Sequence, residues 1–208
     1  MQYPNFSEEK KLWKQGYNFV AGLDEAGRGP LAGPVVAGAV LINKNAKILL
    51  KGINDSKKLS ERQREEIYEV LTNHPAITWG VGVASEKIID RINILEATKL
   101  AMSKALRQAQ GRLKKTADFL LLDGNFKIHC ATPQKSVVKG DAKVMSIAMA
   151  SIIAKVTRDR LMQKFHKKYP QYGFDKHKGY GTSAHFATLE KFGPCQIHRK
   201  TFYPVNKY

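Results

Sequence analysis

The sequence has few cysteines and no long apolar run. Its 208 residues include two cysteines, Cys130 and Cys195, and neither lies in a Cys-x-x-Cys arrangement, which argues against a zinc site. No apolar run reaches the roughly 18 residues that a membrane span needs, and the opening sequence MQYPNFSEEKKLWKQGYNF lacks the apolar core of a secretory signal. We therefore expect a cytoplasmic protein that does not bind membranes, with both thiols reduced.

Acidic residues are scarce beside basic ones. The chain has 35 Lys and Arg against 18 Asp and Glu, a net charge of +17. Residues 155–200 hold eleven basic and three acidic residues, so this segment supplies +8 of that charge, and aromatic residues are interleaved with the lysines. This pattern favours a nucleic-acid partner, because cations neutralise phosphates and aromatic rings pack on sugars and bases. The alternative is a solubilising basic segment whose aromatic residues lie in a core.

The length and the hydrophobic pattern favour a single domain spanning residues 1–208. We expect a core over about residues 17–168 and a basic helical segment over about 169–208. The pattern predicts strands at residues 17–23, 35–42, 47–53, 77–84, 117–122 and 136–138. It predicts helices at residues 61–72, from 85 and through 94–110, at 144–168 and at 183–191. Strands first, then alternating helices and strands, indicate an α/β fold with a mixed sheet.

Acidic residues follow two predicted strands and precede the longest predicted helix. Asp24 and Glu25 end the first strand, Asp123 ends another, and Asp141 lies in a Gly-Asp turn. If the strands are neighbours, these carboxylates meet at one edge of the sheet. Crowded carboxylates repel one another unless a cation joins them, and hard oxygen ligands point to Mg²⁺ or Mn²⁺. Two such metals can activate a water and stabilise a leaving oxygen in phosphodiester cleavage.

Local structure offers simpler roles for some of these acids. Asp141 is well placed to cap a helix, and Asp123, followed by glycine, also suits a tight turn. Asp24 and Glu25 are harder to explain in this way, since two adjacent acids in an apolar, glycine-rich run have only Arg28 as a local basic partner.

Seven sequence blocks resemble those of bacterial type 2 ribonuclease H, and they occur in the same order between residues 22 and 202. The blocks are residues 24–34 (DEAGRGPLAGP), 55–59 (DSKKL), 123–124 (DG), 139–141 (KGD), 146–159 (SIAMASIIAKVTRD), 179–182 (GYGT) and 198–202 (HRKTF). Each block alone is weak, whereas their combination is specific.

The resemblance implies an RNase H-like α/β fold with a mixed sheet flanked by helices and a C-terminal helical extension. It implies four catalytic, metal-binding carboxylates at Asp24, Glu25, Asp123 and Asp141, with Mn²⁺ or Mg²⁺ as cofactor. It also implies an endoribonuclease, expected as a monomer, that cuts 5′ to a ribonucleotide and leaves 3′-hydroxyl and 5′-phosphate ends. The implied substrates are RNA–DNA hybrid duplexes and DNA with embedded ribonucleotides.

Further residues are candidates for substrate binding. Backbone groups of Gly27, Arg28 and Gly29 could hydrogen-bond a 2′-hydroxyl, because glycines allow close approach, although the same residues suit a strand-linking turn. Tyr180 matches the position of the junction-sensing tyrosine in the family that the chain resembles; without that resemblance it would be read as a core or surface tyrosine in a glycine-rich loop. Expected phosphate contacts are Ser56, Lys57 and Lys155, each of which could instead be a solvated surface group.

Other titratable residues in the basic segment have less defined roles. We expect Asp159 to form a structural ion pair, because Arg158 and Arg160 flank it. His177, His185 and His198 lack metal-ligand spacing and are left as possible phosphate or proton-transfer contacts.

Two other functions compete with this one. A non-catalytic nucleic-acid-binding protein would use the charge alone and would show no divalent-dependent nicking. A type 3 ribonuclease H would share the core, but it carries an additional N-terminal domain, and 23 residues precede Asp24 here.

Overall fold

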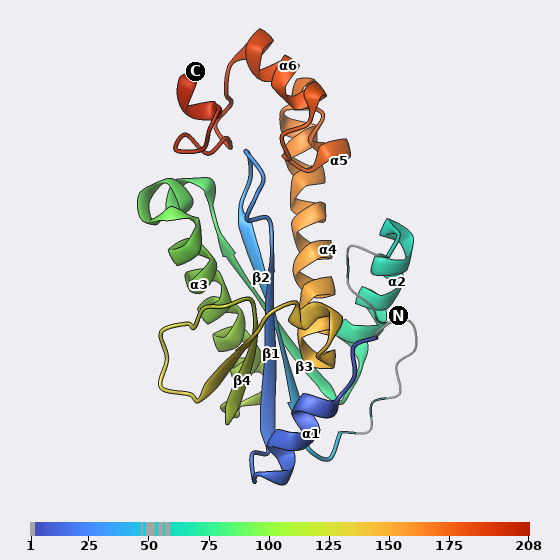
Figure 1. Cartoon of the computed structure of the whole chain (residues 1–208). Coiled ribbons are helices and arrows are strands. Elements are labelled where there is room, and N and C mark those ends of the chain that lie inside the picture. The colour runs from blue at the N-terminus through green and yellow to red at the C-terminus, as the bar shows by residue number, and fades with distance from the viewer. Residues whose placement is uncertain (1–2, 47, 49–52, 54–55, 57–58) are drawn as a thin grey trace.

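The computed structural model describes residues 3–46, 48, 53, 56 and 59–208. In this part of the chain five strands form one mixed sheet in the order β3-β2-β1-β4-β5 (Figure 1). The strands are β1 (Phe19–Ala26), β2 (Val35–Asn43), β3 (Ile77–Ala84), β4 (Phe119–Asp123) and β5 (Gln134–Val137). Strands β1, β2 and β3 form an antiparallel meander, whereas β4 and β5 run parallel to β1.

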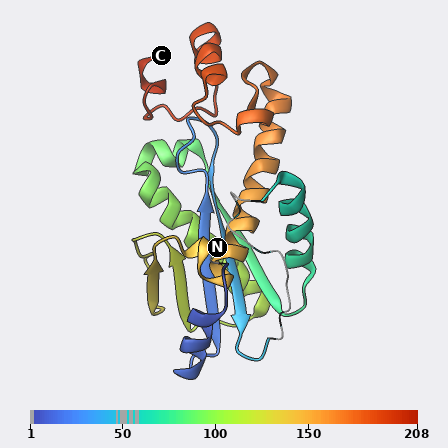
Figure 2. The ribbon, with the colours of Figure 1, turned by 45° about the vertical axis from the view of Figure 1, so that its right-hand side comes forward.

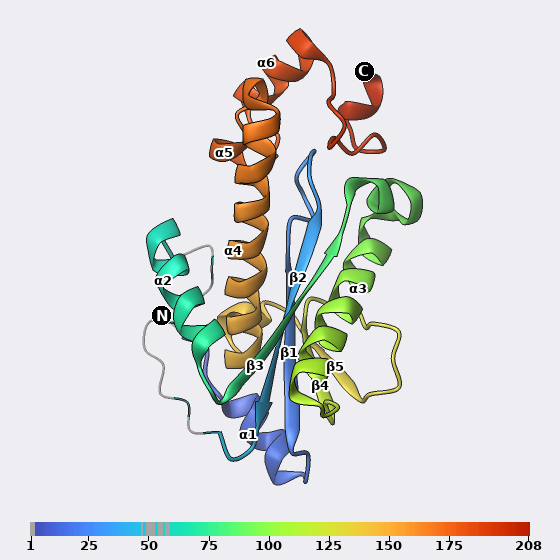
Figure 3. The same cartoon turned by 180° about the vertical axis from the view of Figure 1, so that it is seen from behind.

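Helices cover both faces of this sheet. The helices are α1 (Ser7–Lys14), α2 (Glu61–Asn73), α3 (Glu86–Leu113), α4 (Met145–Lys168), α5 (Phe174–His177) and α6 (Ser183–Phe192), with 3-10 turns at η1 (Gly140–Ala142), η2 (Pro170–Tyr172) and η3 (Val205–Lys207). Helix α3 packs on one face of the sheet and α4 on the other (Figure 3). No helix in the described ranges has the length and apolarity needed to cross a membrane.

Strand glycines bring the two long helices close to the sheet. A Cβ atom on Gly38 of β2 would lie 2.3 Å from the carbonyl oxygen of Ala150 in α4. A Cβ atom on Gly82 of β3 would lie 1.9 Å from the carbonyl oxygen of Ala101 in α3. Real Cβ atoms do not come this near to backbone oxygens, so these strands need glycine where a helix crosses them.

Helix α4 extends beyond the sheet and carries the C-terminal helices at its far end (Figure 2). There the loop between β1 and β2 meets the C-terminal segment, since Ala32 packs in a cluster with Met162, Phe174 and Ile197. An isolated β-bridge also joins Ala32 to His198. The predicted mixed sheet, flanking helices and C-terminal helical extension are therefore confirmed, while the boundary between core and extension near residue 168 stays a prediction.

Some predicted elements differ from those observed. Helix α1 was not predicted. Its Glu9 carboxylate accepts a hydrogen bond from the Ser146 N–H at 2.8 Å, at the start of α4, and such a distant contact is not visible in the local sequence. Helix α3 is one element with a kink at Asn93, where φ is 64°. Strand β5 lies at Gln134–Val137, two residues earlier than expected at its start. Most of the predicted strand at residues 47–53 lies outside the described residues.

Candidate active site

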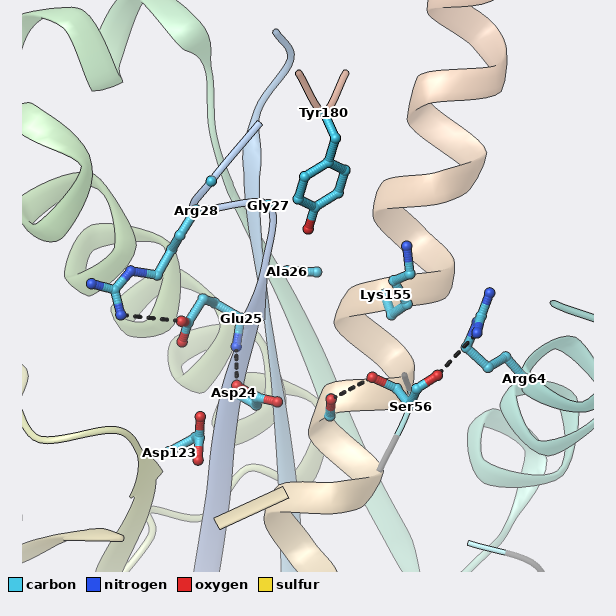
Figure 4. Close-up of a pocket in the computed structure, with 12 residues that line it drawn as sticks. Asp24, Glu25, Ala26, Gly27, Arg28, Ser56, Arg64, Asp123, Lys155 and Tyr180 are labelled. Atoms are coloured by element: carbon cyan, nitrogen blue, oxygen red, sulfur yellow. Dashed lines mark hydrogen bonds and ion pairs between the residues drawn. The ribbon is translucent and has the colours of Figure 1, made fainter. Parts of the chain in front are cut away.

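The sheet places three of the predicted carboxylates side by side. Leu23 of β1 is paired with Leu122 of the parallel neighbour β4, so the next residues, Asp24 and Asp123, emerge together (Figure 4). Glu25 follows on β1. These acids line a cavity of about 450 Å³. The full lining is Asp24, Glu25, Ala26, Gly27, Arg28, Gly29, Ser56, Arg64, Asp123, Ser151, Lys155 and Tyr180.

Asp24 is the buried member of this group, with 4% of its surface exposed. Burial raises its pKa well above the ordinary value, and the charges of Glu25 and Asp123 raise it further. Hydrogen bonds from the Ser151 hydroxyl and from the Glu25 N–H, at 2.7 Å from Oδ1, act in the opposite direction. The folded protein therefore holds a carboxylate where its charge is costly, a cost that a cation at this position would remove.

The donor set fits a hard divalent cation, since it consists of crowded carboxylate oxygens without cysteine or histidine. Among the described residues, no three acidic, histidine or cysteine side chains already form a closed metal cage.

Asp141 reaches this region through a turn instead of a strand. It is buried in η1, and the preceding Gly140 donates its N–H to Asp123 Oδ1 at 2.6 Å. Asp141 is not among the residues that line the cavity. Asp141 lies in η1, and the N-cap position of α4 belongs to Val144. A distant carboxylate serves the start of this helix, since Glu9 accepts the Ser146 N–H at 2.8 Å.

Two buried arginines hold the loop between β1 and β2 by its carbonyl oxygens. Arg199 donates to the carbonyls of Gly33, Arg28 and Gly27 at 3.0, 2.8 and 2.5 Å. Arg158 of α4 donates to the carbonyls of Pro34 and Ala32 at 3.0 and 3.2 Å. Burial, followed by the charge of Arg158, lowers the pKa of Arg199 to about 9.

Glycine is required at residue 27, where the side chain of Arg158 packs against the loop. Gly27 has φ +97°, and a Cβ there would lie 2.0 Å from Arg158 Nε. Sequence reasoning missed the roles of both arginines. The available signal was that Arg158 lies in the block at residues 146–159 and Arg199 in the HRKTF block at residues 198–202.

The remaining predicted contacts surround the cavity. Arg28 forms an ion pair with Glu25 at 3.5 Å. Tyr180 is 46% exposed, and its hydroxyl points into the cavity from the loop before α6 (Figure 4). Ser56 is buried, and its hydroxyl lies 2.9 Å from that of Ser151. Lys57 lies outside the described residues.

Lys155 and Asp159 form an ion pair on one face of α4. Lys155 Nζ donates to Asp159 Oδ1 at 2.8 Å, and burial lowers the pKa of this lysine. Arg64 lies 4.0 Å from the other oxygen of Asp159. The structural ion pair expected for Asp159 is present, with Lys155 and Arg64 as the partners in place of the flanking arginines.

Comparison with known proteins identifies close relatives. The model of the ribonuclease HII family matches residues 21–205. Ribonuclease HII of Chlamydia muridarum is 57% identical over 199 residues, covering 96% of this chain and 88% of that protein. The crystal structure of ribonuclease H2 from Pyrococcus horikoshii OT3 is similar, with a TM-score of 0.72 and 28% identity, and covers 91% of this chain and 96% of that one.

A type 3 enzyme shares the fold at greater distance. Bst-RNase HIII, solved in complex with Mn²⁺, has a TM-score of 0.70 and 18% identity, covering 92% of this chain and 69% of that one. The expected RNase H-like fold is thus confirmed. The family match and the 57% identity decide between the two types. This chain belongs to the ribonuclease HII family.

Proposed function

We propose that this enzyme hydrolyses the phosphodiester on the 5′ side of a ribonucleotide, in RNA–DNA hybrids and in DNA with embedded ribonucleotides. The proposal refines the endoribonuclease activity on RNA–DNA hybrids that membership of the family gives. The products would carry 5′-phosphate and 3′-hydroxyl ends. The observation that carries the proposal is the crowding of Asp24, Glu25 and Asp123 in a cavity that Gly27 and Tyr180 also line.

Four carboxylates would hold the divalent cations, Mg²⁺ or Mn²⁺, in this proposal: Asp24, Glu25, Asp123 and Asp141. When bound, such cations supply an activated water and stabilise the leaving oxygen. Asp24 is central because its burial makes an uncompensated charge costly. Asp123 is oriented by its hydrogen bond from Gly140, which also brings Asp141 to this end of the sheet.

Recognition of the ribose would come from two neighbouring loops that line the cavity and are joined by a hydrogen bond from the Leu31 N–H to the Gly179 carbonyl oxygen at 2.8 Å. Backbone groups of Gly27, Arg28 and Gly29 would approach the 2′-hydroxyl, the group that distinguishes RNA from DNA. The Tyr180 hydroxyl would contact the same ribose from the loop before α6. Arg158 donates to the Ala32 carbonyl in the first loop and to the Lys178 carbonyl just before the second, while Arg199 holds the first loop, so the spacing between the two is set before substrate binds.

The duplex backbone would lie along the basic surfaces around this cavity. Lys155, Ser56 and Lys57 remain proposed phosphate contacts, and Ser56 would have to share its hydroxyl with Ser151. The basic C-terminal segment, residues 169–208, would bind the flanking duplex by neutralising its phosphates.

One assay tests the proposal directly. A labelled DNA duplex with a single ribonucleotide is incubated with Mg²⁺, with Mn²⁺ or with a chelator, and the cut position is mapped. We expect a single divalent-dependent nick 5′ to the ribonucleotide and no nick in the matched all-DNA duplex. A cut on the 3′ side, or equal cutting in the chelator, would contradict the proposal. A non-catalytic binder would give no nick under any condition.

A further inference from the structure

Two histidines of the C-terminal segment are buried against each other. His185 of α6 and His198 are 0% and 1% exposed, and their Nε2 atoms lie 3.0 Å apart. His177 stacks on His185, with ring centroids 4.4 Å apart and planes at 17°. Because His185 and His198 are buried, they do not serve as the phosphate contacts that their place in the basic segment allowed.

Neighbouring backbone groups fix the tautomer of each ring in the pair. His185 Nδ1 lies 2.9 Å from the Tyr180 carbonyl oxygen and must donate to it, which leaves His185 Nε2 as an acceptor. His198 Nδ1 lies 2.9 Å from the Cys195 nitrogen and 3.3 Å from the Cys195 carbonyl oxygen. When Nδ1 accepts the shorter contact, from the N–H, Nε2 carries the proton. In this neutral arrangement His198 donates to His185, and His185 donates to Tyr180.

The same loop is held at its other backbone groups. The Tyr180 N–H donates to the His177 carbonyl oxygen at 2.9 Å, and the Tyr180 carbonyl accepts the Thr182 N–H at 2.9 Å in addition to His185. His177 Nδ1 accepts from the Gly179 N–H at 3.2 Å, and Arg158 Nη1 donates to the Lys178 carbonyl at 3.0 Å. The backbone around Tyr180 is therefore fixed while its side chain projects into the cavity.

We propose that His185 and His198 are positioning residues that fix Tyr180 at the ribose-binding side of the cavity through the Tyr180 carbonyl. This inference rests on the proposed role of Tyr180 in ribose recognition. His198 is next to Arg199, whose guanidinium binds the Gly27 and Arg28 carbonyls. One two-residue segment thus sets the positions of both loops that would contact the ribose.

A purely space-filling role is the alternative explanation. Phe174 packs against both rings, with centroids 5.6 Å from His185 and 5.7 Å from His198. A space-filling role would require only the volume of the rings, whereas the positioning role requires a proton donor at the place of His185 Nδ1. Two amide substitutions at this residue separate the alternatives.

The experiment compares His185→Asn with His185→Gln on the duplex that contains one ribonucleotide. The Asn amide can replace Nδ1 and keep the bond to the Tyr180 carbonyl, whereas the Gln amide can replace Nε2 and keep only the bond from His198. We expect His185→Gln to lower kcat about 10-fold or more with KM little changed, because a small misplacement of a positioning group is costly. His185→Asn should stay within about 3-fold of wild type for the same reason.

The Tyr180→Phe variant shows whether His185→Gln lowers kcat through Tyr180. In Tyr180→Phe, which should itself impair cleavage, adding His185→Gln should produce little further loss of kcat, since residues that act as a unit are not additive. Melting temperatures of all variants report any general loss of fold. If His185→Gln does not fold, His198→Asn and His198→Gln form a second pair, because only the Gln amide can keep the donor to His185.

Equal kcat values for the Asn and Gln variants, or a full additional loss in the Tyr180→Phe background, would overturn the positioning inference and leave the proposed function standing. Wild-type cleavage by Tyr180→Phe alone would remove Tyr180 from ribose recognition and overturn the inference with it. The metal dependence and the cut position, measured on the wild-type enzyme, would be unaffected by either result.

Discussion

Asp123 Oδ1 accepts a hydrogen bond from the backbone N–H of Gly140 at 2.6 Å. This contact joins the end of strand β4 to the 3-10 turn that carries Asp141. A Cβ on Gly140 would lie 2.7 Å from Ile147 Cδ1 and 3.2 Å from Asp123 Oδ1, so a larger residue here would have to displace one of these side chains. The fourth acid of the proposed metal site is thus placed relative to the third by one backbone hydrogen bond.

Asp123 should have a structural role that can be separated from its catalytic one. Asp123→Asn keeps an oxygen to accept the Gly140 N–H, so we expect near-normal stability with loss of cleavage. Asp123→Ala removes the acceptor and should also lower the free energy of unfolding by about 1–3 kcal/mol. Chemical denaturation together with the single-ribonucleotide assay measures both effects. Equal stability of the two variants would show that the hydrogen bond contributes nothing.

Asp24→Asn should abolish divalent-dependent cleavage while duplex binding survives. We expect at least about a 100-fold loss of rate, since metal stabilisation of the transition state is worth several kcal/mol. Full activity of this variant with Mg²⁺ would exclude Asp24 as a metal ligand. Binding measured in a chelator serves as the control, because the basic surface is unchanged.

The same substitution should not destabilise the metal-free fold. The pKa of Asp24 is raised in the folded protein, so this group favours folding below its ordinary pKa and loses that contribution as the pH rises through the folded value. At neutral pH the raised pKa of Asp24 therefore lowers the stability of the fold, and Asn does not carry this cost. We expect the melting temperature of Asp24→Asn in a chelator to equal or exceed that of wild type. Added Mn²⁺ should raise it less than it raises the wild-type value.

Arg199→Lys should loosen the loop that contains Gly27. A lysine cannot reproduce the three bonds to the carbonyls of Gly33, Arg28 and Gly27. We expect the free energy of unfolding to fall by about 2 kcal/mol or more, because buried carbonyls lose their donors. The matched control is Arg160→Lys on the surface of α4, where ion pairs to Glu65 and Glu69 are worth about 1 kcal/mol or less. Equal losses of unfolding free energy in the two variants would contradict the inference that Arg199 holds this loop.

Mild acid should destabilise the fold through the histidine pair. Burial lowers the pKa of both His185 and His198 to about 4, below the value of about 6.5 for an unfolded histidine. Between these values the unfolded chain binds more protons, so stability is complete above about pH 6.5 and falls as the pH drops toward about 4. Melting temperatures measured at steps from pH 7 to 4.5 should show this decline.

A variant isolates the contribution of the pair from that of the carboxylates. His198→Gln has one titrating ring fewer, so the difference in melting temperature between wild type and variant should shrink or reverse as the pH falls. A difference that stays constant over this range would show that folding does not lower the pKa of His198.

The sequence by itself determined the order of the long elements and the strand-end positions of Asp24, Glu25 and Asp123. It could do so because alternating and helical patterns of apolar residues are local, and because an acid that ends an apolar strand is visible in the sequence. Seven short blocks in the right order, spread over residues 22–202, were also enough to indicate the family that the comparisons then established.

Only the tertiary structure decided which of these acids meet and what holds the loops around them. The pairing of β1 with β4 sets Asp24 beside Asp123. The bond from Gly140 spans 17 residues, and that from Arg199 to Gly27 spans 172. Helix α1 was missed for the same reason, since Glu9 meets Ser146 across 137 residues. Such contacts arise from chain packing and leave no periodic pattern at either end, so the residues that position this site became visible only in the folded chain.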